Sequence, residues 1–181
     1  MTAYEKLQRN LKRRPRKWLV TGAAGFIGSH LVETLLRLNQ QVVGLDNFST
    51  GYAHNVDTVK KQLPSAQRRR FRFIEGDITD AATCSRACRQ VDYVLHQAAL
   101  GSVPRSFADP LATHLANTTG FIQVLEAAKK SNVSRVVYAS SSSVYGDAKG
   151  LPKCEGIEGT PLSPYAVSKA CLLYTSDAAD E

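Results

Sequence analysis

The sequence lacks any stretch that could span a membrane, and it shows no secretory leader. No run approaches the roughly 18 consecutive apolar residues of a transmembrane helix, and no apolar segment follows the charged N-terminus. We therefore expect a cytoplasmic protein without a membrane partner. Repeats, low-complexity segments and a visible second domain are also missing, so the 181 residues predict one domain with a sizeable core.

Cysteine is scarce and carries no metal-binding pattern. The four residues form one C-x-x-x-C pair but lack the paired spacing of a zinc knuckle. A core of this size needs no disulfide. We expect reduced structural thiols and no metal site at Cys84, Cys88, Cys154 and Cys171.

Acidic residues are absent from one basic segment. Seven Lys and Arg residues lie between positions 6 and 17 with no acid among them, and elsewhere basic and acidic residues are equal in number. Tyr4, Leu7 and Leu11 recur at helical spacing, which predicts a short helix whose apolar stripe packs on the body while its cations face water. Residues 1–17 are therefore expected to be a basic extension that binds neither nucleic acid nor a membrane. We expect a second basic cluster, residues 68–70 with Arg72, in a solvated loop.

An apolar run at residues 19–21 breaks into three glycines, Gly22, Gly25 and Gly28. This pattern predicts a strand, a tight turn and the start of a helix. Glycine allows positive φ and close approach of a ligand, and the N–H groups of a helix N-terminus can bind a pyrophosphate. Glycine triplets also occur in ordinary loops, so the turn alone leaves a dinucleotide site and a simple turn both open.

Further short apolar segments alternate with helical patterns along the chain. The segments predict strands over residues 41–46, 71–75, 91–96 and 135–139. Helical spacing predicts helices over residues 26–38, up to about residue 63, and over 111–131. Strands that alternate with helices indicate an α/β protein with a parallel sheet covered on both faces.

Polar and small residues follow these strands where a dinucleotide would lie. Asp46 ends the second strand, where a carboxylate accepts both ribose hydroxyls and repels a 2′-phosphate, so the sequence favours NAD over NADP. After the third strand, Asp77 could accept the adenine amino group and Ile78 could cover the ring, although Asp77 could equally cap a helix. Small residues around Ala98 would let a cofactor pass close to the backbone.

The fifth strand leads into four serines, residues 140–143, and residues 163–169 then read S-P-Y-A-V-S-K. Tyr165 and Lys169 share one face of the predicted helix, where an ammonium group can lower the pKa of a phenol enough for general-base catalysis. Taken singly, the serines fit a polar loop and the Tyr-Lys pair fits an ordinary helix start. Their order, however, brings all of these motifs to the carboxyl edge of one sheet.

Together the motifs resemble the extended short-chain dehydrogenase/reductase superfamily from residue 18 to about 169, and within it the bacterial UDP-N-acetylglucosamine 4-epimerases. Residues 45–51, 95–106, the serine cluster and 162–169 carry the resemblance. It implies a Rossmann-type doubly wound parallel sheet over residues 18–170 and a role in nucleotide-sugar metabolism and polysaccharide biosynthesis. The implied NAD-binding residues are Gly22, Gly25, Phe26, Ile27, Gly28, Asp46, Asn47, Asp77, Ile78, Ala98 and Lys169, and the implied UDP-sugar-binding residues are Ser102, Ser142 and Ser143.

The resemblance also implies 4-epimerisation by transient oxidation. Tyr165, held as tyrosinate by Lys169, would take the proton of the 4-hydroxyl while the C4 hydride passes to NAD, with Ser141 relaying the proton. The keto sugar would then turn over and receive the hydride on its other face. Related dehydratases carry carboxylates where Ser142 and Ser143 stand, which argues against elimination. The alternatives are another sugar-nucleotide dehydratase or reductase, and a non-catalytic NAD-binding protein.

Residues 171–181 do not resemble the family. We expect them to be a non-native tail, read through after a broken reading frame, on a chain truncated before the substrate domain. Such an N-terminal fragment is expected to be inactive. For the full-length enzyme, the resemblance suggests a homodimer.

Overall fold

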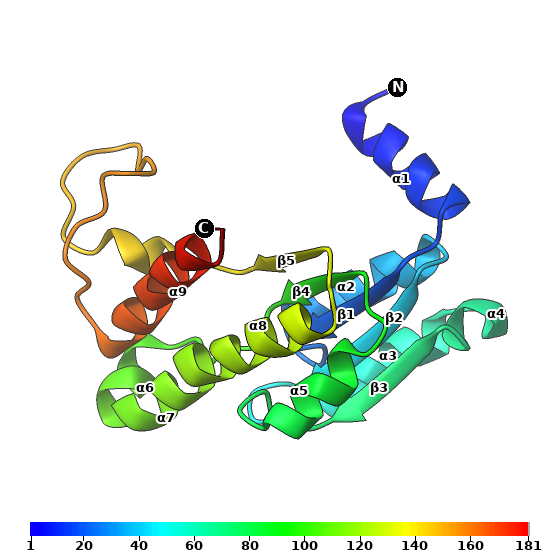
Figure 1. Cartoon of the computed structure of the whole chain (residues 1–181), viewed down its shortest axis with the longest axis horizontal. Coiled ribbons are helices and arrows are strands. Elements are labelled where there is room, and N and C mark those ends of the chain that lie inside the picture. Colours follow the sequence, from blue (N-terminus) through cyan, green and yellow to red (C-terminus); the bar gives the residue numbers. More distant parts are fainter. Residues whose placement is uncertain (181) are drawn as a thin grey trace. The chain divides into compact units, whose positions relative to one another are not determined.

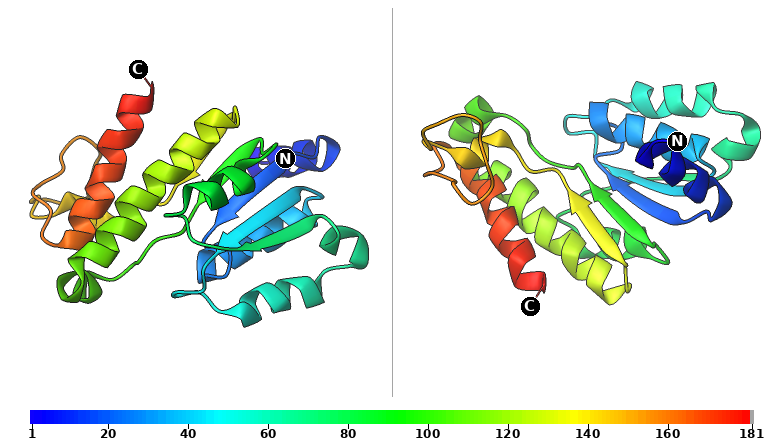
Figure 2. Two further views of the ribbon diagram at one scale, coloured as in Figure 1. Left: turned by 60° about the horizontal axis from the view of Figure 1, so that its bottom comes forward. Right: turned by 90° about the horizontal axis from the view of Figure 1, so that it is seen from above.

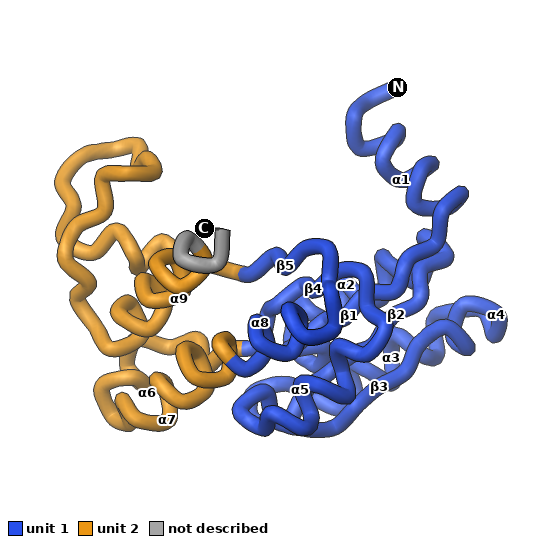
Figure 3. Tube along the Cα trace, in the orientation of Figure 1, with its two compact units in different colours: residues 1–98, 123–138 blue, residues 99–122, 139–181 orange. Residues whose placement is uncertain are grey.

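The computed structural model describes the backbone of residues 1–180 and the side chains of residues 1–176, and it contains two compact units (Figure 3). Unit 1 comprises Met1–Ala98 and Gln123–Tyr138, and unit 2 comprises Ala99–Ile122 and Ala139–Glu181. Residues 18–170, which the sequence predicts as one domain, include parts of both units.

Unit 1 is built on a sheet of five parallel strands (Figure 1). The strands are β1 (Lys17–Thr21), β2 (Gln41–Asp46), β3 (Phe71–Glu75), β4 (Tyr93–His96) and β5 (Arg135–Tyr138), in the order β3-β2-β1-β4-β5. In the register of the sheet, Val20 of β1 lies between Gly44 of β2 and Leu95 of β4. The winding reverses beside β1, as in a doubly wound sheet, so the predicted fold class is confirmed.

Helices cover both faces of this sheet (Figure 2). Helices α2 (Phe26–Arg37) and α3 (Ala53–Gln62) lie on one face; α5 (Ala81–Cys88) and the part of α8 (Gly120–Lys130) that starts at Gln123 lie on the other. Successive strand residues point to opposite faces, so Leu19 joins one core and Val20 joins the other. One core includes Leu19, Val43, Leu45, Ile74, Val94, Cys88 and Val124, and the other includes Val20, Val42, Val32, Leu36 and Val59.

Helix α2 begins at the predicted residue, but the two apolar residues of its first turn are exposed. Phe26 and Ile27 are 79% and 57% exposed, and the buried residues of the helix are Gly28, Ser29, Val32, Leu35 and Leu36. The helix packs closely only from Gly28 onward, where its backbone meets the turn after β1. The first two residues therefore extend beyond the packed part of the unit.

The predicted N-terminal helix exists as α1 (Ala3–Arg13), but its apolar stripe is not buried. A capping box starts the helix, with Thr2 and Glu5 each accepting the backbone N–H of the other. No residue of α1 is buried, and Tyr4 and Leu7 are 60% and 53% exposed. The predicted packing of this stripe on the body is therefore wrong.

The second basic cluster differs slightly from the prediction. Arg68 ends a short helix, α4 (Ser65–Arg68), instead of lying in a loop. Arg69, Arg70 and Arg72 are exposed as expected, although Arg72 belongs to β3.

Unit 2 contains α6 (Val103–Ala108), α7 (Pro110–His114), a π-helical turn (Leu115–Thr119), a 3-10 turn (Ser142–Tyr145) and α9 (Pro164–Asp180). The sequence predicts one helix over residues 111–131; the structure interrupts it with the π-helical turn. Helix α9 crosses the expected boundary after residue 170 without a break. Among the residues described, no helix is both long enough and apolar enough to cross a bilayer.

Candidate functional site

The turn after β1 is held so tightly that two of its positions accept only glycine. Gly22 has a φ of +69°, and a Cβ there would lie 2.8 Å from the backbone nitrogen of Ala98. A Cβ on Gly28 would lie 2.0 Å from the carbonyl oxygen of Gly22. Since both neighbours are backbone atoms, neither can move aside without shifting the turn. The glycines therefore lock the turn, the start of α2 and the loop after β4 together.

Thr21 forms hydrogen bonds with His96 and with the backbone of the loop after β4. The Thr21 hydroxyl lies 2.9 Å from Nδ1 of His96, and both side chains are buried. The same hydroxyl accepts hydrogen bonds from the backbone nitrogens of Gln97 and Ala98, each at 3.2 Å. Ala98 is thus held against the glycine turn.

The N-terminus of α2 offers uncapped N–H groups at this turn. Gly25 is the N-cap residue and supplies no side-chain hydrogen bond. The first N–H groups of a helix have no partner within the helix, and the helix dipole makes this end positive. Phe26 and Ile27, which carry the first of these groups, are exposed. An uncapped helix start behind a glycine turn fits a pyrophosphate.

Asp46 ends β2 and turns its carboxylate toward the glycine turn. Its Oδ2 accepts a hydrogen bond from the backbone nitrogen of Ala24 at 2.9 Å, and its Oδ1 accepts one from Phe48 at 2.8 Å. The residue is 9% exposed. A carboxylate oxygen has two acceptor positions, so each oxygen retains one for a ribose hydroxyl.

Asp77 belongs to a small hydrogen-bonded group beside Asp46. Its Oδ2 accepts from Asn47 Nδ2 at 2.7 Å, and its Oδ1 accepts from both the backbone nitrogen and the hydroxyl of Thr79 at 2.8 Å. Burial acts to raise the pKa of Asp77, but the hydrogen bonds from Thr79 and Asn47 outweigh it, so the pKa is lowered. Asp77 is therefore a charged acceptor at neutral pH.

The alternative role of Asp77 as a helix cap is excluded, because Asp80 caps α5 by accepting from Ala82 and Thr83. Ile78 is placed differently from the sequence expectation. It is only 7% exposed and packs in the core that includes Ile74 and Cys84, which leaves little of its side chain for a ligand.

In unit 2, α9 carries Tyr165 and Lys169 one helical turn apart. Ser163 starts the helix by accepting the backbone N–H of Ala166 at 3.0 Å. Lys169 is 4% exposed, and its Nζ donates to the carbonyl oxygen of Ala139 at 3.0 Å. Desolvation of the ammonium lowers the pKa of Lys169 from 10.5 to about 8. Such a strongly shifted buried lysine is typical of functional sites.

The serines of unit 2 make local hydrogen bonds and border a cavity. Ser141 accepts from the backbone nitrogen of Ser143 at 3.2 Å and from its hydroxyl at 2.9 Å. Ser102 caps α6 by accepting from Arg105 at 3.2 Å. Ser141 and Ser142 line a cavity of about 820 Å³. A capping hydroxyl still carries a proton that it can donate, so these bonds leave a role toward a substrate open.

Sequence reasoning missed one buried residue, Asn117, in the π-helical turn. Its Oδ1 accepts from the backbone nitrogen of Leu100 at 2.7 Å, and its Nδ2 donates to the hydroxyl of Ser168 at 3.0 Å. Ser168 in turn donates to the carbonyl oxygen of Tyr165 at 2.8 Å. Asn117 therefore positions the helical turn that carries Tyr165 and Lys169. An asparagine inside an apolar helical pattern was the available signal.

The expected site residues divide between the two units. Unit 1 contains the expected NAD-binding residues up to Ala98, and unit 2 contains the expected catalytic and sugar-binding residues together with Lys169. Within unit 1, the residues that gather at the carboxyl edge of the sheet are Gly22, Gly25, Gly28, Asp46, Asn47, Asp77 and Ala98.

A glycine turn after β1, a carboxylate after β2 and this strand order define a dinucleotide-binding α/β unit of the Rossmann type. The chain belongs to the NAD dependent epimerase/dehydratase family, which matches residues 18–181.

Several relatives are similar to most of this chain. The UDP-glucose 4-epimerase of Mycolicibacterium smegmatis is 41% identical over 153 residues, which are 83% of this chain and 47% of the relative. The UDP-N-acetylglucosamine 4-epimerase of Methanobrevibacter ruminantium M1, solved with UDP-N-acetylmuramic acid, is 35% identical with a TM-score of 0.81, and covers 92% of this chain and 51% of its own. The dTDP-glucose 4,6-dehydratase DesIV of Streptomyces venezuelae, solved with NAD and TYD, is 36% identical with a TM-score of 0.81, and covers 90% and 51%. The chain spans about half the length of the curated relatives it matches.

The shifted pKa of Lys169 predicts how stability depends on pH. Below pH 8 both the folded and the unfolded states carry the charge, so the cost of burying it is fully present. Between about pH 8 and 10.5 the unfolded state binds more protons than the folded state, so this cost declines as pH rises. Lys169→Met should therefore raise the free energy of unfolding most below pH 8, and the gain should shrink by about 3 kcal/mol toward pH 10.5.

Urea unfolding at a series of pH values measures this difference between variant and parent. Lys129→Met, which changes an exposed lysine in α8, is the matched control and should show no such trend. Parallel curves for Lys169→Met and the parent protein would show that Lys169 is not buried as a charged group.

Proposed function

We propose that a protein of the relatives' full length carrying this sequence is a cytoplasmic, NAD-dependent 4-epimerase of UDP-sugars, of the UDP-N-acetylglucosamine/UDP-N-acetylgalactosamine class. The observation that carries the proposal is the buried Lys169, which lies one helical turn from Tyr165 and whose Nζ donates to the carbonyl oxygen of Ala139. The relatives named as 4-epimerases support it. Because this chain spans about half of their length, we expect no turnover from the chain alone.

NAD fits the residues of unit 1. The pyrophosphate would lie on the glycine turn and the first N–H groups of α2, and the adenosine ribose would donate to Asp46. Asp77 and Asn47 would lie beside the adenine. When bound, NAD would supply a reversible acceptor for hydride.

The side chains of unit 2 would move the proton of the reaction. Tyr165 would remove the proton of the sugar's 4-hydroxyl and return it to the product. The positive charge of Lys169 stabilises negative charge on the phenol oxygen, and the Ala139 carbonyl orients its ammonium group. The hydroxyl of Ser141 would relay the proton, and Ser102, Ser142 and Ser143 would contact the sugar.

The residues before Val144 favour epimerisation over elimination. Family membership alone does not separate the two reactions, since a dehydratase is about as similar to this chain as the epimerases are. Elimination must remove a carbon-bound proton and release water, which requires an acid and a base. Ser142 and Ser143 supply hydroxyls there and no carboxylate. A non-catalytic NAD-binding role is disfavoured because Tyr165, Lys169 and Ser141 are all present.

Asp46 predicts which dinucleotide binds. In isothermal titration calorimetry, we expect this chain to bind NAD at least about tenfold more tightly than NADP, because the carboxylate repels a 2′-phosphate. Asp46→Asn should reduce this preference, since its amide carries no charge. Asp57→Asn, at an exposed position of α3, makes the same change of charge and should keep the preference. Equal affinity of the parent for both dinucleotides would contradict the assignment.

The role of Tyr165 predicts a separation between catalysis and binding. In the protein of full length, Tyr165→Phe should lower kcat for 4-epimerisation by roughly 10²–10⁴-fold and leave the Kd for NAD unchanged. Tyr4→Phe, at an exposed tyrosine of α1, is the matched control and should retain the parent's kcat. A product that has lost water would identify a dehydratase, and undiminished turnover by Tyr165→Phe would rule out the mechanism.

We also propose that the full-length enzyme is a homodimer. In unit 2, exposed apolar side chains recur at intervals of four residues along α6, α7 and the π-helical turn, at Val103, Phe107, Leu111 and Leu115. An exposed apolar row of this kind is typical of an interface.

Sedimentation velocity can test whether this row forms the dimer. Leu111→Glu combined with Leu115→Glu should raise the dimer dissociation constant at least about tenfold. Leu151→Glu combined with Ile157→Glu, at other exposed apolar positions of unit 2, should leave it unchanged. A parent protein that sediments as a monomer would refute the dimer.

A further inference from the structure

Helix α1 is formed without being packed. Its start is stabilised by Thr2 and Glu5 of its own capping box, and Gln40 Nε2 donates to the carbonyl oxygen of Leu11 near its end. None of its residues is buried. A helix of 11 residues is marginal in water unless one face packs on a partner. The exposed face of α1 is therefore available to a partner outside unit 1.

The two sides of α1 differ in chemistry. Tyr4, Leu7 and Leu11 follow one another at i, i+3 and i+7, so they share a face. Leu7 and Leu11 line a cavity of about 250 Å³ together with Trp18 and Tyr93. The stripe is therefore not tightly packed against these two aromatic residues of the sheet. By helical spacing, Lys6, Arg9 and Arg13 lie opposite this stripe, and Lys12 lies at its side.

Most of the positive charge of this segment has no counter-ion within the chain. Among the described residues, Arg16 is the one cation between positions 6 and 17 that makes an ion pair, with Asp92 at 3.7 Å. The one acid of α1, Glu5, is engaged in the capping box. These cations are therefore free to pair with anions outside the chain.

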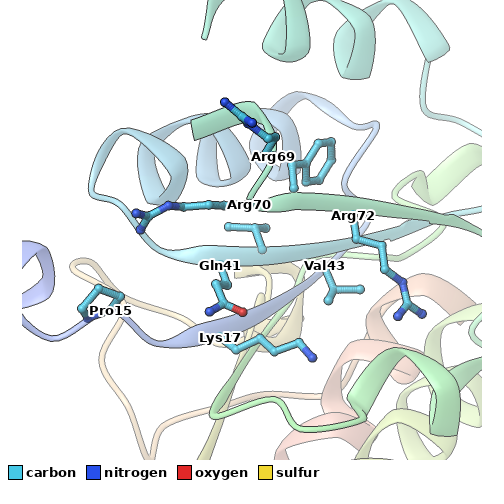
Figure 4. A pocket seen from close by; sticks show the side chains of 9 residues that line it. Pro15, Lys17, Gln41, Val43, Arg69, Arg70 and Arg72 are labelled. Carbon is cyan, nitrogen blue, oxygen red and sulfur yellow. The ribbon is translucent and has the colours of Figure 1, made fainter. Parts of the chain in front are cut away.

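The positive surface continues past the end of α1. Pro15, which follows the helix, lines a cavity of about 610 Å³ together with Lys17, Arg69, Arg70 and Arg72 (Figure 4). The three arginine side chains point in different directions and do not converge on one point (Figure 4). Diverging cations suit an extended anionic surface better than a single small anion.

We propose that α1 and these arginines dock unit 1 onto an anionic phospholipid surface. The apolar stripe would enter the boundary between headgroups and acyl chains, and the cations of the polar face would be attracted to the lipid phosphates. A nucleic acid would pair with the cations, and a base would stack on Tyr4, but it offers no apolar environment for the exposed Leu7. The sequence expectation of no membrane partner depended on packing of the stripe, which the structure does not show. The proposal is independent of the epimerase assignment.

Vesicle flotation with the 181-residue chain tests the proposal. Binding is expected to vesicles of phosphatidylcholine with phosphatidylglycerol, to be absent with phosphatidylcholine alone, and to weaken in high salt. Arg9→Glu combined with Lys12→Glu should reduce binding at least about tenfold. Lys129→Glu combined with Lys149→Glu makes the same change of net charge at exposed positions and should retain binding.

Tyr4→Gln combined with Leu7→Gln separates lipid insertion from charge attraction, because neither substitution changes the charge of α1. Since both side chains are exposed, the thermal unfolding midpoint should not change, whereas vesicle binding should fall at least about tenfold. Three results would overturn the proposal. They are no binding to anionic vesicles, equal losses in the two charge-reversed variants, and unchanged binding by Tyr4→Gln with Leu7→Gln. Tighter binding of a single-stranded oligonucleotide than of vesicles would instead assign the surface to nucleic acid.

Discussion

The close contact between Gly28 and the carbonyl oxygen of Gly22 is the constraint on which unit 1 depends. A side chain at Gly28 would come within 2.0 Å of that oxygen, so α2 can lie where it does only with glycine at this position. The contact holds the start of α2 against the turn after β1. The N-cap residue of α2, Gly25, supplies no side-chain hydrogen bond. The contact also sets Ala24 within hydrogen-bonding distance of Asp46. The same contact therefore determines both how α2 packs in unit 1 and how the glycine turn is shaped.

Features that depend on neighbouring residues in the sequence could be predicted from short sequence patterns. The bounds of β2 and β3, and the position of Asp46 at the end of β2, follow from short apolar runs that end in polar residues. Contacts between distant residues decide the rest. Asn117 meets Leu100 and Ser168 only after folding, and the stripe of α1 has the helical period whether or not anything covers it. The sequence predicted that Ile78 follows the carboxyl end of the third strand, but it could not show that the side chain of Ile78 is buried in the core.

Lys169 shows how unit 2 balances stability against chemistry. An ammonium group has three donors, and the structure pairs Nζ with one carbonyl oxygen, that of Ala139. Desolvation therefore prevails, and the pKa falls to about 8. A methionine of similar length would avoid this cost, so the charge weakens the fold that contains it. The proposed role of Lys169 nevertheless requires this charge, because an ammonium beside Tyr165 favours the ionised phenol.

The direction of the strands keeps the two proposed roles of unit 1 apart. In a parallel sheet all amino ends lie at one edge and all carboxyl ends at the other. The glycine turn, Asp46 and Asp77 follow the carboxyl ends of β1, β2 and β3. Helix α1, Arg70 and Lys17 precede or begin strands, so they lie at the amino edge. Docking through α1 would therefore leave the carboxyl edge of the same sheet open to solvent. Unit 1 could then bind a lipid surface and a dinucleotide at the same time.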